Sequence, residues 1–303
     1  GSAGSSSFKT MGLDQTMSSP SAVAGSSLSG ETIKWVRGDN IGRGSLGTVF
    51  QAMDQKSGQV FAVKEVAFNP NDDEDRKFKD ALEKELNILQ EVRHHRIVSY
   101  LGHDYFDNCL YVYLEYLAGG SLAQVLKDFG AFEEALIQSY TAELVDGLAY
   151  LHTREPPIVH RDVKGANVLV DLKCHVKLAD FGCSKRTQET MSHTIKGSIP
   201  WMAPEVINNT GYGRAADVWS LGCVVIEMAQ GKSPWGIFDN LFQAMAKIGM
   251  SKETPPVPEN LSEGCKSFIS ACLQREKDDR PNTTALLEHD FVKFAPEVPD
   301  PDF

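Results

Sequence analysis

The sequence has no apolar segment long enough to cross a membrane. The longest candidate, residues 221–229, falls short of the ~18 apolar residues that a spanning helix needs, and Glu227 interrupts it. No apolar stretch near the N-terminus resembles a signal peptide. We therefore predict that the chain does not insert into a membrane.

The sequence also lacks the cysteine and histidine spacings of a zinc site. Its six Cys form no Cys-x-x-Cys pair, and its eight His do not fall at zinc-like intervals. Free thiols are typical of proteins kept in a reducing compartment. We expect an intracellular protein, located in the cytoplasm, with the nucleus left open.

Positive charge is scarce. Lys and Arg total 30 against 41 Asp and Glu, which gives a net charge of −11. Phosphate backbones and anionic lipid surfaces attract basic faces, so this balance argues against nucleic acid or a membrane surface as the main partner. The composition indicates no oligomeric state.

Composition divides the chain into three parts. Residues 1–30 are rich in Ser and Gly and almost uncharged, which predicts a disordered leader, and its opening Gly-Ser-Ala-Gly-Ser-Ser resembles an artificial linker. Residues 293–303 form an acidic, Pro-rich tail. Between them, residues 35–292 have the composition of a folded domain without internal repeats.

The expected secondary structure changes along this domain. Runs of β-branched and aromatic residues predict strands at 33–36, 48–53, 59–66, 100–105 and 110–116, with one helix at 75–92. Apolar residues at helical spacing predict further helices at 121–127, 133–152, 217–230 and 265–273. We predict an α+β fold with a β-rich lobe over 35–117 and a helical lobe over 118–292, and a ligand cleft between them.

A glycine-rich segment lies between two predicted strands. Ile41-Gly-Arg-Gly-Ser-Leu-Gly-Thr-Val49 fits the pattern G-x-G-x-x-G-x-V. Because the chain continues as a strand and not as a helix, we expect a hairpin and not a dinucleotide-binding turn. Glycines let a backbone approach phosphate groups closely and offer N–H donors to them.

Lys64 lies in an apolar predicted strand, on the same face as Ala62. A buried ammonium group is costly unless a negative group pairs with it. In the predicted helix 75–92, Glu85 falls within an apolar stripe. Either Glu85 turns out to the solvent, or it forms an ion pair with Lys64.

The most specific motif is His160-Arg-Asp-Val-Lys-Gly-Ala-Asn167, which fits H-R-D-x-K-x-x-N. Asp180-Phe-Gly182 begins thirteen residues after Asn167, and Ala203-Pro-Glu205 follows further on. With the glycine-rich segment, these motifs stand in the order typical of protein kinases. The chain resembles the eukaryotic protein kinase superfamily over roughly residues 35–292, which implies the bilobal protein kinase fold with ATP and Mg²⁺ as cofactors.

The resemblance implies a role for each matching residue. Asp162 would accept the proton of the substrate hydroxyl group, and Lys164 would offset charge on the transferred phosphate. Asn167 and Asp180 would supply hard oxygen ligands to Mg²⁺. Lys64, held by Glu85, would contact the α- and β-phosphates of ATP.

The resemblance also implies which residues surround ATP. Leu114 matches the gatekeeper position, and the backbones of Glu115 and Leu117 are expected to bond adenine. The other residues expected to line the ATP site are Ile41, Gly42, Gly44, Gly47, Val49, Ala62 and Leu169. Two structural contacts are implied as well: an ion pair between Glu205 and Arg280, and an anchor from Asp217 to the backbone of His160 and Arg161.

Lys164 matches serine/threonine kinases and not tyrosine kinases. The strings at 97–102, 163–169 and 197–205 are similar to those of MAP kinase kinase kinases, which implies a MAP kinase kinase as the protein substrate. The p21-activated and germinal-centre kinases share much of this signature, but Ser198-Ile199-Pro200 departs from their Thr-Pro. A pseudokinase scaffold and a small-molecule kinase are further alternatives. The complete nucleotide and metal residues argue against the first, and Ala-Pro-Glu argues against the second.

Several hydroxyl residues lie between Asp180 and Ala203. Thr194, four residues before Ser198, is the expected regulatory phosphosite, and the other candidates are Thr190, Ser192 and Ser198. A phosphate adds about −1.5 to −2 charge and would order the segment by pairing with Arg161. Ser198 is expected instead to hydrogen-bond Asp162 and Lys164.

Overall fold

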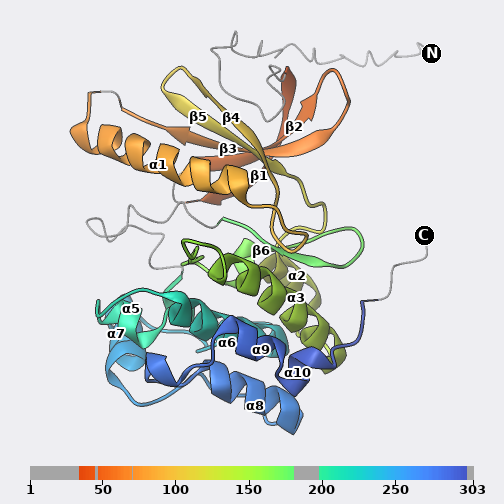
Figure 1. Ribbon diagram of the computed structural model, residues 1–303, viewed down its shortest axis with the longest axis vertical. Helices are drawn as coiled ribbons and strands as arrows, with labels where there is room; N and C mark the ends of the chain where they lie inside the picture. Colours follow the sequence, from red (N-terminus) through yellow and green to blue (C-terminus); the bar gives the residue numbers. More distant parts are fainter. Residues whose placement is uncertain (1–33, 45–46, 70, 181–197, 299–303) are drawn as a thin grey trace, which may run out of the picture.

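The structure, a computed structural model, describes residues 34–44, 47–69, 71–180 and 198–298. These residues form a small lobe built on a sheet and a large lobe built from helices (Figure 1). The predicted α+β fold of two lobes is confirmed. The leader 1–30, the end of the tail and the candidate phosphosites Thr190, Ser192 and Thr194 lie outside the described residues.

A five-stranded antiparallel sheet forms the small lobe, in the order β1-β2-β3-β5-β4. Its strands are β1 Trp35–Gly44, β2 Gly47–Asp54, β3 Val60–Ala67, β4 Tyr100–Phe106 and β5 Cys109–Glu115. Gly42 pairs with Val49 and Gly44 with Gly47, so the glycine-rich segment forms the expected hairpin. Strand β1 runs further than predicted, because its glycines interrupt the apolar pattern without ending the pairing with β2.

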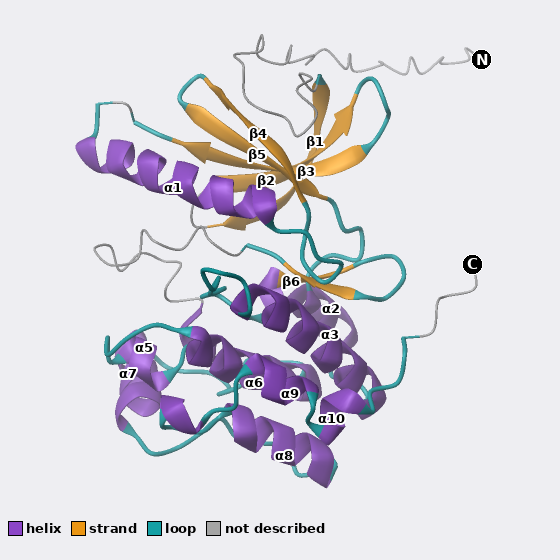
Figure 2. Ribbon diagram, viewed as in Figure 1, coloured by secondary structure: helices purple, strands orange, loops and turns teal. Residues whose placement is uncertain are grey.

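Helix α1, Asp73–Glu91, lies across the sheet (Figure 2). Leu82 and Leu86 are buried in one apolar cluster with Val112 of β5. Burying such leucines contributes roughly 1.5–3 kcal/mol each. Glu85 lies on the same buried side and is only 8% exposed, so its carboxylate does not turn out to the solvent.

The large lobe contains eight α-helices and one small hairpin within the described residues. The helices are α2 Leu122–Phe129, α3 Glu134–His152, α5 Pro204–Ile207, α6 Arg214–Gln230, α7 Leu241–Met245, α8 Glu263–Cys272, α9 Thr283–Leu287 and α10 Asp290–Lys293. Strands β6 Val168–Val170 and β7 Val176–Leu178 pair with each other. Short helical turns are η1 Gly165–Asn167, η3 Ile199–Trp201 and η5 Lys277–Asp279, and η4 Ala246–Met250 is a π-helix. None of the helices in these described ranges is long and apolar enough to span a membrane.

Helix α6 is the centre of the large lobe, because the residues from Ala216 to Met228 are all buried. A helix that is apolar all round belongs in a core. It begins at Arg214, three residues before the predicted start, because arginine and alanine add no apolar signal to the first turn. It ends at Gly231 with φ of 66°, where a Cβ atom would lie 2.8 Å from the Ala131 nitrogen.

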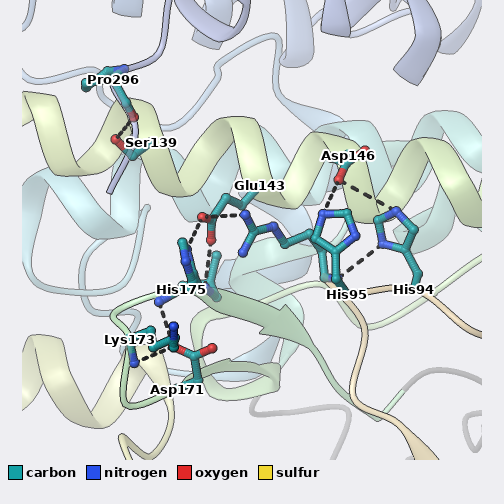
Figure 3. Close-up of polar contacts among 11 residues, drawn as sticks. His94, His95, Ser139, Glu143, Asp146, Asp171, Lys173, His175 and Pro296 are labelled. Atoms are coloured by element: carbon teal, nitrogen blue, oxygen red, sulfur yellow. Dashed lines mark hydrogen bonds and ion pairs between the residues drawn. The ribbon is translucent and has the colours of Figure 1, made fainter. Parts of the chain in front are cut away.

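Two contacts close the large lobe. The predicted ion pair is present: the Arg280 guanidinium donates to both carboxylate oxygens of Glu205, at 2.6 and 2.8 Å. The start of the tail lies against helix α3. Ser139 Oγ of this helix donates to the Pro296 carbonyl at 2.7 Å (Figure 3). The tail is thus packed on the lobe at least as far as Pro296.

Candidate active site

The catalytic motif folds into a compact cluster around Asp162. Lys164 Nζ and Asn167 Nδ2 both donate to Asp162 Oδ2, each at 2.8 Å. Asn167 Nδ2 also bonds the Asp162 carbonyl at 2.9 Å, which orients the amide so that its oxygen is left for another partner. Within the described residues, Oδ1 of Asp162 accepts no hydrogen bond, so this oxygen can receive the proton of a hydroxyl substrate.

Asp217 of helix α6 holds the start of this loop. Its Oδ2 accepts the His160 amide and its Oδ1 accepts the Arg161 amide, both at 2.8 Å. Oδ2 also contacts His152 Nε2 at 2.8 Å. The predicted anchor is therefore confirmed. It fixes Arg161 at φ of 74°, a left-handed backbone conformation that costs a non-glycine residue on the order of 1–3 kcal/mol.

Lys64 lies beside Asp180, which is one of the two expected Mg²⁺ ligands. Its side chain is buried, and Nζ lies 2.7 Å from Asp180 Oδ1. Burial disfavours the charged form of Asp180, but the charge and hydrogen bond of Lys64 outweigh it and hold the pKa of this carboxyl below its usual value. The ion pair between Lys64 and the buried Glu85 stays a prediction.

Asn167 and Asp180 have the chemistry that Mg²⁺ requires. The Asn167 amide oxygen and the ionised Asp180 carboxylate are hard oxygen donors of the kind that Mg²⁺ prefers. The Ala179 amide donates to the Asn167 carbonyl at 2.8 Å, so the two segments are joined directly. The residues present fit the metal, although their role as ligands stays a prediction.

The adenine end of the site lies against strands β3 and β5. Ala62 pairs with Leu114 across these strands, and Leu117 packs with Leu169 in a small apolar cluster below them. The Glu115 amide donates to the Ser99 carbonyl at 2.9 Å, so an adenine contact at this residue would use its carbonyl. The structure brings these predicted residues to one place, and their contacts with ATP stay predictions.

Gly47 has a spatial reason to be glycine at the phosphate end. A Cβ atom there would lie 1.7 Å from the Glu65 carbonyl oxygen. Because this oxygen belongs to the backbone, no change of side-chain rotamer could remove the clash. At Gly42 the nearest atom to a Cβ would be 3.8 Å away, in ordinary contact. The fold itself therefore does not require glycine at position 42, and its contact with ATP stays a prediction.

Ser198 precedes the turn η3 and contacts the catalytic loop. Lys164 Nζ donates to Ser198 Oγ at 2.7 Å, and Ser198 is buried. Its expected contact with Lys164 is therefore present, whereas no hydrogen bond joins it to Asp162 among the described residues. Its candidacy as a phosphosite stays a prediction.

Sequence reasoning missed Glu227. This residue of α6 was noted only as the charge that interrupts an apolar run. In the structure its Oε2 accepts the Gly165 amide at 2.9 Å and the Trp201 indole N–H at 2.8 Å. The available signal was a carboxylate in the apolar run 221–229 of this helix, because a buried carboxylate needs hydrogen-bond donors.

Two acids of helix α3 hold the segment that follows α1 (Figure 3). Glu143 contacts Arg96 at 2.9 Å, His175 Nδ1 at 2.7 Å and the Val176 amide at 2.7 Å. One turn on, Asp146 lies close to both His94 and His95. These contacts connect the end of the small-lobe helix to the core of the large lobe.

His94, His95 and Asp146 are close enough to suggest a metal site. Their candidate ligand atoms all lie within 4.8 Å of one another. However, the Arg96 amide donates to His94 Nδ1 at 3.2 Å, which places the proton of the neutral ring on Nε2. A ring protonated at Nε2 cannot bind a metal there, so the cluster is better explained as a polar anchor for the loop.

Comparison with known proteins identifies the family. The sequence model of the protein kinase domain family matches residues 35–292 of this chain. "Mitogen-activated protein kinase kinase kinase 3" of Arabidopsis thaliana is 44% identical over 289 residues, covering 92% of this chain and 47% of the relative. "Mitogen-activated protein kinase kinase kinase YODA" of the same plant is 45% identical over 262 residues, covering 86% of this chain and 29% of the relative.

A third relative, "Mitogen-activated protein kinase kinase kinase A" of Dictyostelium discoideum, is 40% identical over 270 residues, covering 88% of this chain and 28% of the relative. The chain belongs to the protein kinase domain family. Within it, these relatives confirm the predicted resemblance to serine/threonine kinases of the MAP kinase kinase kinase branch. The chain spans about half of the relatives' length or less.

Replacing Asp217 by Asn tests the anchor of the catalytic loop. Asn offers one acceptor oxygen, and its NH₂ group would face a backbone donor, so one amide loses its partner. We expect the free energy of unfolding in urea to fall by roughly 1–3 kcal/mol. We also expect kcat to fall up to roughly 10²-fold, since Asp162 shifts with the loop. The matched control is D128N on exposed α2, and an equal effect of both variants would contradict the anchor.

The ionisation of Glu227 predicts a pH-dependent stability. Burial raises the pKa of its carboxyl from 4.5 to about 7, against the hydrogen bonds from Trp201 and Gly165 and the charge of Lys164. The folded state therefore holds an extra proton between these pH values, and ionisation destabilises it as pH rises. Urea unfolding should show E227Q gaining on wild type by on the order of 3 kcal/mol between pH 4.5 and 8. A constant difference across this range would mean that the pKa is not raised.

Proposed function

We propose that this chain acts as a MAP kinase kinase kinase, which transfers the γ-phosphoryl group of ATP to serine or threonine of a MAP kinase kinase. The observation that carries the proposal is the cluster in which Lys164 and Asn167 converge on one oxygen of Asp162, while the other oxygen accepts no hydrogen bond within the described residues. The relatives named above support the tier of the cascade, because each bears the name of such a kinase.

The chain's own residues account for the steps around the transfer. Asp162 Oδ1 would orient the substrate hydroxyl and take its proton, while Lys164 neutralises charge close by. Mg²⁺, held by Asn167 and Asp180, would neutralise charge on the phosphates when bound. Lys64 Nζ lies 2.7 Å from Asp180 Oδ1, and it would contact the α- and β-phosphates of ATP from this position.

The alternatives differ in their residues or relatives. A pseudokinase scaffold usually lacks a nucleotide or metal residue, whereas Lys64, Asp162, Asn167 and Asp180 are all present here. A p21-activated or germinal-centre kinase would be expected to carry Thr-Pro at Ser198-Ile199. The proposed location is the cytoplasm, with the nucleus left open.

We further propose activation by phosphate on Thr194, which lies outside the described residues. Arg161 is the expected cationic partner of this phosphate. Its guanidinium lies 5.8 Å from the ring centre of Tyr212. Asp217 fixes the backbone of Arg161. A phosphate that pairs with this side chain would therefore be tied to the catalytic loop.

Transfer to substrate can be measured with labelled ATP and Mg²⁺ on a panel of catalytically inactive MAP kinase kinases. Asp162→Asn keeps the shape of the side chain but cannot take the proton, so we expect transfer to fall by roughly 10²–10⁴-fold. Equal melting temperatures of the two proteins would serve as the folding control. Equal transfer by both would reject the role of Asp162. Transfer by wild type to a general protein substrate but to none of the panel would favour the p21-activated or germinal-centre alternative, and no transfer at all would favour the pseudokinase.

Replacing Thr194 by Ala should prevent activation in cells. Because the missing phosphate no longer orders the segment, we expect activity to fall by roughly 5–150-fold, the range of typical regulatory coupling. The matched control is T254A, which removes an exposed hydroxyl group outside this segment and should leave activity close to wild type. Full activity and normal activation of T194A would end this proposal without affecting the role of Asp162.

A further inference from the structure

Glu227 is a carboxylate inside the core of the large lobe, only 5% exposed. Its two hydrogen bonds come from segments far apart in the sequence. Gly165 is 62 residues away and belongs to the catalytic loop, whereas Trp201 is 26 residues away and belongs to the turn after Ser198. One side chain thus joins the two segments that border the expected position of the substrate hydroxyl.

The two partners adjoin functional residues directly. Gly165 follows Lys164, and Lys164 itself donates to Ser198 at 2.7 Å, on the cleft side. Glu227 joins the same two segments from the side of helix α6, through Gly165 and Trp201. Trp201 is held at a second point, because Ser220 Oγ of the same helix donates to its carbonyl at 2.7 Å. The turn at Trp201 is therefore fixed to α6 by both its backbone and its side chain.

The contact with Gly165 leaves no room for a side chain. A Cβ atom at this position would lie 2.5 Å from Glu227 Oε1, and that oxygen belongs to a side chain that is itself buried and bonded. The catalytic loop can pack this closely on α6 only with glycine here. Glu227 thus sets both the hydrogen bond and the distance between loop and helix.

Such a buried carboxylate is expensive for the fold. The other charged or titratable groups that face it are Lys164 of the catalytic loop and Cys223, one turn earlier on α6. Burial dominates and raises the pKa of Glu227, so the group weakens the folded state at neutral pH. An apolar side chain would pack in this core at lower cost. The carboxylate therefore has another task than stability.

We propose that Glu227 is a positioning residue for phosphoryl transfer, which holds the substrate-side turn at Trp201 in register with the catalytic loop at Gly165. The proposal rests on the kinase activity proposed above. Both donors bond the same oxygen, Oε2. A glutamine amide oxygen can replace that oxygen, so the position needs an acceptor but not a negative charge.

The main alternative role for Glu227 is to bind a cation on the substrate. The two roles differ because a positioning residue needs only an acceptor atom and no charge. A carboxylate that reads a cation on the substrate must be ionised, so E227Q would raise KM as strongly as removal of the side chain. A positioning residue acts on kcat instead, and the conservative variant restores it.

The test compares E227Q, E227L and W201F with the active, phosphorylated full chain. Kinetics on a serine-containing protein substrate should show E227Q within roughly threefold of wild type, since a neutral acceptor makes a somewhat weaker bond. E227L should lose roughly 10²-fold in kcat, because both donors lose their partner and the two segments separate. W201F, which removes one donor, should fall between them.

The matched control for W201F is Trp235→Phe in the same lobe. Trp235 is also buried, but its indole N–H has no hydrogen-bond partner among the described residues, so W235F should retain wild-type kcat. Hydrogen exchange gives a readout that does not depend on activity. In E227L, amides of 163–167 and 198–205 should exchange faster, with no such change in E227Q.

Three results would overturn the proposal: full kcat in E227L, loss of kcat in E227Q equal to that in E227L, or unchanged exchange in E227L. A wild-type protein without any transfer would refute the kinase proposal instead. The exchange experiment would still decide whether Glu227 joins the two segments.

Discussion

The contact between Asp217 and the amides of His160 and Arg161 is the constraint on which the active site depends. It holds Arg161 in a backbone conformation that a non-glycine residue adopts only at a cost. Asp217 is itself fully buried in α6. The place of Asp162, one residue further on, is therefore set by the core of the large lobe, on which the loop packs through the buried His160 and Val163.

Helix α6 extends this principle along its length. Asp217, Ser220 and Glu227 are polar residues in a helix whose other buried positions are mostly apolar, and each accepts from or donates to a segment of the active site. The burial of Glu227 is costly, and the donors that it satisfies offset only part of that cost. Helix α3 has a similar role toward the small lobe, since Glu143 and Asp146 hold the loop that follows α1. Two core helices thereby connect the parts that must act together.

Much of this arrangement could be predicted from the sequence, because motifs of fixed spacing carry it. The catalytic motif, the glycine-rich hairpin and the pair Glu205–Arg280 lie where the resemblance implied. The boundaries were less accurate, as at the start of α6, where the residues carry no apolar signal. Glu227 was missed because its partners are a backbone amide and an indole, and neither leaves a recognisable spacing in the chain.

The sequence by itself determined the class of the protein, the order of its elements and the identities of the reactive side chains. These depend on neighbours within a few residues, whose periodicity and motif spacing can be read directly. Tertiary structure alone decided which oxygen of Asp162 accepts from Lys164 and Asn167, that Lys64 meets Asp180 across 116 residues, and that the Gly165 amide donates to Glu227. Such choices depend on distances of a few ångström between segments remote in the chain, and only the packed core sets those distances.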